Sequence, residues 1–218
     1  MELKKKIAVL CDYRLMPKRV GGMDRFFWLF DAECKKLGYE ITWFFPNHET
    51  HEGYSGLNII AVEGNSIEHT FLAHHQSFDV VFTHFLELCT PFYKAVKKEK
   101  LAAEIITVDH NPRPFGGYPL KKRVQKRLKG YLYGSFIDFF VGVSKHTVKE
   151  ISKDFGSHTI EKSIVIHNGI TCSNFIKRDK RTILKPKFLV ASGSLNEGLS
   201  DDFYQKIAEI AKKSNAKL

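Results

Sequence analysis

The chain has 218 residues, which is long enough for one large α/β domain or for one domain and part of another. Its formal net charge of +10 favours an anionic partner such as nucleic acid, anionic lipid or a phosphorylated small molecule. The four cysteines form no Cys-x-x-Cys pair, which argues against a structural zinc site and predicts free thiols in a reducing cytoplasm.

Buried strands and helical periods alternate along the chain, joined by short connections. Apolar runs predict strands at residues 6–11, 41–45, 57–62, 79–84, 104–108, 139–143 and 163–166. The segments between them, from Met23, Ser66, Phe85, Leu120 and Lys145, carry helical spacing. Such an alternation predicts an α/β fold, a doubly wound parallel sheet of the Rossmann-like type with helices on both faces. The apolar run at the start is too short for a signal peptide or a membrane span.

The stretch from residue 139 to residue 175 forms one strand, helix and strand unit. Ser144 stands at the N-cap of the helix, and Gly156 ends it. Ligands of such sheets bind at the carboxyl ends of the strands. The pairs Ser144-Lys145 and Asn168-Gly169 follow two strand ends and are therefore candidate binding residues.

A Gly-Gly pair, Gly21 and Gly22, precedes the first helix. Glycines at this position let backbone N–H groups approach an anion at the positive end of a helix. A plain tight turn explains a lone Gly-Gly pair equally well. The loop His48-Glu49-Thr50-His51 has the wrong spacing for a zinc-protease helix, so we expect no metal site.

Two separated patterns resemble family 4 retaining glycosyltransferases of the GT-B fold. One is V-x-V-S-K, a helix, then I-V-I-x-N-G-I and Phe, which resembles the end of their N-terminal domain. A generic βαβ unit with an Asn-Gly turn explains that stretch alone equally well. The other pattern resembles the opening of the family and consists of Gly21, Gly22, Asp24, Arg25, Gly38, Tyr39 and Glu40.

The resemblance implies transfer of a sugar from a nucleotide-sugar donor to a hydroxyl of a glycan or lipid-linked acceptor, with retention. It implies that His110, just beyond a strand end and beside Asn111, lies next to the transferred sugar as a catalytic or binding residue; a polar loop histidine is the alternative. It places Gly21, Gly22, Asp24 and Arg25 near the donor phosphates and the acceptor. No cofactor or metal is implied, because helix ends and cations can neutralise the leaving diphosphate.

A basic helix begins near Leu120. Its apolar stripe, Leu120, Val124, Leu128 and Leu132, lies among the cations Lys121, Lys122, Arg123, Lys126, Arg127 and Lys129. One interpretation is an ordinary surface helix, and the other is a contact with anionic lipid on the inner face of the membrane. We expect the stripe to face the core in both cases. No nucleic-acid module is recognisable, so nucleic acid is not an expected partner.

The resemblance also predicts the domain organisation. Residues 1–176 form the acceptor-side domain, 177–187 a basic linker, and 188–218 the incomplete start of a donor-binding domain. In that last part Ser194 stands where the family has Arg, and Glu197 where it has Lys. The chain covers about half of the family's length, so we expect it to be inactive alone. The alternative function is a shortened, non-catalytic homologue that binds lipid, glycan or a partner subunit.

Overall fold

The computed structural model describes residues 4–17, 20–48, 53–62, 64–111, 113–114, 116–169 and 209. The chain separates into two compact units, Met1–Thr171 and Cys172–Leu218. Only the first unit is described beyond a single residue. The predicted boundary after residue 176, the linker and the incomplete second domain lie outside the described residues.

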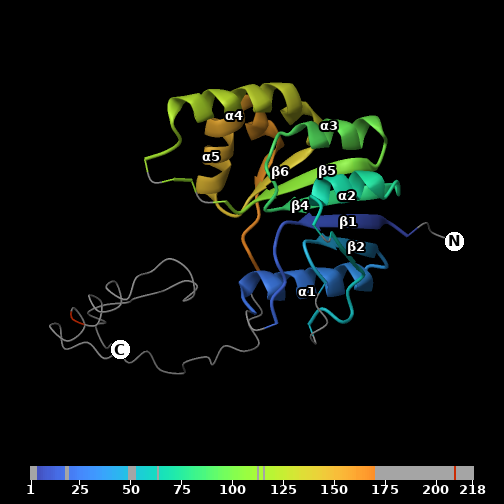
Figure 1. Cartoon of the computed structure of the whole chain (residues 1–218). Helices are drawn as coiled ribbons and strands as arrows, with labels where there is room; N and C mark the ends of the chain where they lie inside the picture. Colours follow the sequence, from blue (N-terminus) through green and yellow to red (C-terminus); the bar gives the residue numbers. More distant parts are fainter. Residues whose placement is uncertain are drawn as a thin grey trace. The chain divides into compact units, whose positions relative to one another are not determined.

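Seven parallel strands form one sheet in the order β3-β2-β1-β4-β5-β6-β7 (Figure 1). All seven predicted strands lie in it, which confirms the predicted parallel sheet. The chain reverses its direction of winding between β1 and β4, where ligands bind in such sheets. The strands are β1 (Lys6–Cys11), β2 (Glu40–Phe45), β3 (Ile59–Ala61), β4 (Phe78–His84), β5 (Ala102–Asp109), β6 (Phe139–Gly142) and β7 (Ser163–Val165).

Helices cover both faces of the sheet, but unequally. Figure 1 shows α1 on one face and α2 to α5 on the other. The helices are α1 (Gly22–Lys36), α2 (Ile67–Ala73), α3 (Pro91–Lys98), α4 (Leu120–Tyr133) and α5 (Lys145–Phe155), with short 3-10 turns η1 (Gly134–Phe136) and η2 (Ser157–Lys162).

Alternation along the strands divides the core into two parts. Trp43 and Phe45 of β2 pack with Phe27 under α1, whereas Phe44 between them packs with Phe71 of α2 on the opposite face. Successive side chains of a strand point to opposite faces, so a strand covered on both faces is apolar throughout. The nearly continuous apolar runs in the sequence are explained by this double burial.

Helix α4 contradicts one expectation from the sequence. Its apolar stripe, Leu120, Val124, Leu128 and Leu132, is between 48% and 73% exposed instead of facing the core. The helix packs mainly on α5 and α3 in an outer layer. Its inner face is set by Gly130, where an added Cβ would overlap the carbonyl of Phe155 in α5.

The predicted membrane-contact cations divide between the two sides of α4. Lys126 turns inward to Asp154 of α5, and Lys129 pairs with Glu87 at 2.7 Å. Arg127 donates to the carbonyl of Lys153, and Lys122 lies over the Tyr118 ring. Lys121 and Arg123 are exposed. No helix within the described ranges is both long and apolar enough to cross a bilayer.

Candidate functional site

Two histidines meet where strands β4 and β5 end. His84 is the last residue of β4, and His110 directly follows β5. Nδ1 of His84 lies 3.0 Å from Nε2 of His110, a hydrogen-bonding distance. The ring of Phe85 stacks on His110 with centroids 4.6 Å apart. The predicted site residue His110 is therefore held by two neighbouring side chains of β4 and its end.

Burial keeps both imidazoles neutral at neutral pH. It lowers the pKa of His84 to about 3, and the neighbouring His110 contributes in the same direction. Burial also lowers the pKa of His110, although the charge of Asp109 opposes that shift. A neutral imidazole has one donor and one acceptor nitrogen, so His110 can exchange a hydrogen bond with a ligand without carrying charge.

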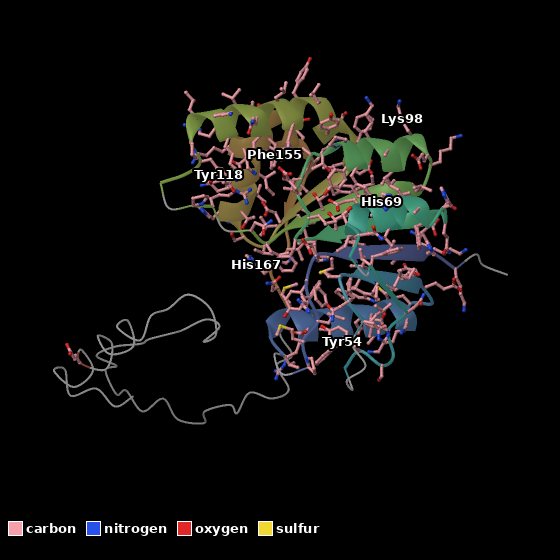
Figure 2. The ribbon with its side chains drawn as sticks, in the orientation of Figure 1. Tyr54, His69, Lys98, Tyr118, Phe155 and His167 are labelled. Atoms are coloured by element: carbon pink, nitrogen blue, oxygen red, sulfur yellow. The ribbon has the colours of Figure 1, made fainter. Side chains whose placement is uncertain are left out.

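A buried ion cluster fixes the loop that follows His110. The guanidinium of Arg113 contacts Asp109 at 2.7 Å and Asp154 of α5 at 2.8 Å, and Lys126 of α4 lies 3.5 Å from Asp154. Arg113 also donates to the carbonyl of Asn111 at 2.7 Å. Burial acts to lower the pKa of Arg113, but Asp109 and Asp154 raise it overall. The cluster ties α4, α5 and the end of β5 together; Figure 2 labels Tyr118 and Phe155 beside it.

Two cavities contain His110. The larger, of about 630 Å³, lies beside the first turns of α5 and is within the size range of small-molecule sites. Its lining includes the polar side chains of His110, Asn111, Arg113, His146, Thr147, Glu150 and Lys153. The smaller, of about 160 Å³, is mostly apolar and lies toward α1; His84, His110, His167 and Asn168 reach it among Phe26, Phe30 and Phe82. His110 thus separates a polar space from an apolar one.

The predicted residues at the end of β6 and β7 lie close to this site. The hydroxyl of Ser144 accepts the backbone N–H of Thr147 at 3.1 Å, which confirms it as the N-cap of α5. Lys145 is exposed in the first turn of α5. Asn168 shares the smaller cavity with His110, and Gly169 is exposed beside it. Asn111 lies in the larger cavity, and its backbone N–H donates to Asp109 at 3.0 Å.

The start of α1 contributes differently from what the resemblance implies for Asp24. The carboxylate of Asp24 is fully buried, and it accepts hydrogen bonds from Tyr54 at 2.6 Å and from the Gly21 N–H at 2.7 Å. Asp24 therefore holds the Gly-Gly loop in place and has no surface for a ligand. Gly21, Gly22 and Arg25 are exposed. The two cavities that contain His110 are not lined by these three residues.

Sequence reasoning missed His84, Phe85 and the ion cluster. The signal for His84 was present, because a histidine ends a predicted strand next to the point where the winding reverses. The signal for Arg113 was weaker: it lies four residues after Asp109, and its second partner, Asp154, lies in another helix.

Fold and site together define a Rossmann-like α/β domain with its functional edge at the strand carboxyl ends. The model of Glycosyltransferase Family 4 matches residues 20–174, well over half of the chain. The chain therefore belongs to glycosyltransferase family 4, and its described part is an N-terminal glycosyltransferase domain. This confirms the resemblance and the fold predicted from the sequence.

Solved structures of glycosyltransferases share the fold. A glycosyltransferase from Rickettsia africae aligns with 99% of this chain and 50% of its own length, at 17% identity and a TM-score of 0.54. Anabaena HepE, solved in complex with UDP, aligns with 76% of this chain and 44% of its own length, at 11% identity and a TM-score of 0.53. The chain thus spans half or less of the length of these proteins. A comparison with curated protein sequences gives no match.

Proposed function

We propose that this chain is the acceptor-side part of a retaining glycosyltransferase, which moves a sugar from a nucleotide-sugar to a hydroxyl of a glycan or lipid-linked acceptor in surface-glycan or glycolipid synthesis. The observation that carries the proposal is His110: a neutral, held imidazole at a strand carboxyl end, between a polar and an apolar cavity. Its position in a family 4 domain supports a role beside the transferred sugar.

The other residues have roles that follow from their places. The cluster around Arg113 holds the loop of His110 and Asn111 still while a ligand binds. Gly21 and Gly22 expose backbone at the positive end of α1, with Arg25 in its first turn, and can receive donor phosphates. Lys145 does the same at α5, and Asn168 lies across the smaller cavity from α1. Cations and helix ends stabilise the leaving diphosphate in this scheme. HepE was solved with UDP, which supports a nucleotide-linked donor here.

We expect the 218-residue chain to have no turnover by itself. Holding two reactants in register can lower a barrier by roughly 7–11 kcal/mol, and a GT-B cleft needs a wall from each of two domains. This chain supplies the wall with His110, and its second part has Ser194 where the family has Arg.

A product assay tests the proposal in two arms. The 218-residue chain and a completed two-domain protein are each incubated with a panel of nucleotide-sugars and hydroxyl acceptors. Product from the completed protein alone is the expected result, and His110→Ala should lower its rate at saturating donor while leaving its stability nearly unchanged. Product from the short chain would refute the half-site explanation. Lipid, glycan or subunit binding with no transfer by either protein would support a non-catalytic binding protein instead.

We further propose that α4 contacts an anionic membrane surface, which would hold the protein at the cytoplasmic face of a membrane. The exposed stripe of Leu120, Val124 and Leu128 favours this, because an apolar stripe with cations along its borders is typical of helices that lie in a lipid interface. The exposed cations Lys121 and Arg123 can add about 1 kcal/mol each near anionic headgroups. Lys126 and Lys129 are turned to Asp154 and Glu87 and do not contribute to this face.

Sedimentation with vesicles tests this surface. The double variant Lys121→Glu, Arg123→Glu should lose binding to vesicles that contain anionic lipid, and the wild type should lose it at high salt. The matched control is Lys94→Glu, Lys98→Glu, which changes the charge equally on exposed positions of α3 (Lys98 is labelled in Figure 2). Equal binding by the wild type and both variants would show that α4 is an ordinary surface helix.

A further inference from the structure

His84 and His110 lie on the same face of the sheet. His84 pairs with Val108 in the register of β4 and β5, and His110 follows two residues later, so both side chains turn toward the face that α1 covers. Both line the apolar cavity beside Phe26 and Phe30 of α1. Their rings are 5.3 Å apart and tilted by 25°, with the 3.0 Å contact between Nδ1 of His84 and Nε2 of His110.

A strained residue holds the second ring against His110. Phe85 has a φ of +61°, in the left-handed region that bulky residues avoid because the Cβ crowds the backbone. Such conformations persist where the surroundings over-determine them, and they gather at functional sites. Here the conformation brings the Phe85 ring within 4.6 Å of His110 and within 5.9 Å of Tyr13. His110 is thus packed against a ring that its own turn holds in one orientation.

The proton count of this pair restricts what His110 can do. A neutral imidazole carries one N–H and one acceptor nitrogen, so a hydrogen bond between two such rings needs one donor and one acceptor. The Nε2 atom of His110 is occupied by His84, and only Nδ1 remains for a ligand. We propose that His84 is a positioning residue that locks His110 in one neutral tautomer and leaves its Nδ1 atom as the single nitrogen that meets substrate.

This role deepens the proposed function, because it assumes that His110 lies beside the transferred sugar. The titratable groups around the pair are Asp109, which precedes His110; Cys11, which pairs with His84 across β1 and β4; and His167, which lines the same cavity. Of these, Asp109 raises the pKa of His110, and burial outweighs it. His84 itself is buried and surrounded by the rings of Phe26 and Phe27, which disfavour its charged form.

Nuclear magnetic resonance of the 218-residue chain with ¹⁵N-labelled histidine tests the lock directly. Long-range correlations between ring protons and ring nitrogens distinguish the two tautomers and the charged form, and His110→Gln identifies the signals of His110. We expect one neutral tautomer in large excess across neutral and mildly acidic pH. His84→Asn keeps a polar atom at the place of Nδ1 and should preserve the lock. His84→Phe keeps a ring without that atom and should give two exchanging tautomers of His110.

Comparable amounts of both tautomers in the wild type would overturn the proposal, whether or not any variant folds. An unchanged His110 spectrum in a folded His84→Phe variant would overturn it as well. This readout needs no turnover, so it separates the lock from the proposed function: a locked His110 in a completed protein that transfers no sugar would refute the transferase and leave the lock. In an active completed protein, His84→Phe should lower kcat and alter its pH profile, and His84→Asn should restore both.

Discussion

Replacing Gly130 by alanine tests the packing that fixes the orientation of α4. An added Cβ would lie 2.6 Å from the carbonyl carbon of Phe155 and nearer to its oxygen, whereas ordinary contact begins at 3.4 Å. The two helices would have to separate by about 0.8 Å at that carbon and by more at the oxygen, and neither atom belongs to a flexible side chain. The same movement would stretch the bond from Arg127 to the Lys153 carbonyl and the contact between Lys126 and Asp154.

Two opposing effects set the size of the change. Overpacking of a close contact costs about 1–3 kcal/mol, at the upper end where backbone must move. Alanine in place of glycine within a helix returns about 1 kcal/mol of helix propensity. With the stretched contacts added, we expect a net loss of about 2 kcal/mol in the free energy of unfolding, which corresponds to a fall in Tm of about 4–8 °C in a chain of this size.

Urea unfolding followed by circular dichroism measures this difference. The matched control is Gly22→Ala at the first position of α1, where an added Cβ meets nothing within 4 Å. The control should be as stable as the wild type or slightly more so. A Gly130→Ala variant as stable as its Gly22→Ala counterpart would refute the close approach of α4 and α5, and with it the outward orientation of the apolar stripe.

Three further predictions concern the ion cluster, the cap and the buried histidine. Asp154→Ala leaves Arg113 and Lys126 without a buried carboxylate and should cost about 3–5 kcal/mol in urea unfolding; a loss near zero would contradict the cluster. Ser144→Ala should cost about 1 kcal/mol by removing the cap of α5, measured in the same way. His84 has a pKa of about 3 when folded and about 6.5 when unfolded, so the unfolded chain binds more protons between these values. Stability from this residue is complete above the unfolded pKa and should fall by about 2 kcal/mol from pH 7 to pH 5. Parallel curves for wild type and His84→Asn would contradict this.

The fold was predictable because its signals are local. Strands of a parallel sheet are buried on both faces and read as apolar runs, as residues 41–45 do, and Ser66, Ser144 and Gly156 delimit their helices by caps that need only a few neighbouring residues. The orientation of α4 was not predictable in this way. A stripe at Leu120, Val124 and Leu128 reveals an amphipathic helix, but it does not tell whether the core or the solvent lies opposite, and the inner face depends on a glycine and a lysine that find their partners in α5.

The candidate site shows the same division. His110 was found because it follows a strand and fits a family pattern. Its partner His84 is 26 residues away and becomes visible only when the register of β4 and β5 is known. Asp24 fits the family pattern too, but its buried bond to Tyr54, 30 residues along the chain, gives it a supporting place behind the loop. Long-range pairing decided these two cases, and local sequence carries no record of it.

The central position of β1 has a consequence for how the chain folds during its synthesis. β1 is made first, yet it lies between β2 and β4, and Ile7 pairs with both Ile41 and Val80. At translation rates of roughly 5–20 residues per second, the Val80 partner emerges roughly 4–15 s after Ile7. During that interval the β1–β2 pair with α1 has one open strand edge of apolar residues, which invites pairing with other chains. We expect chaperones to be needed most in this interval, before β4 closes the sheet.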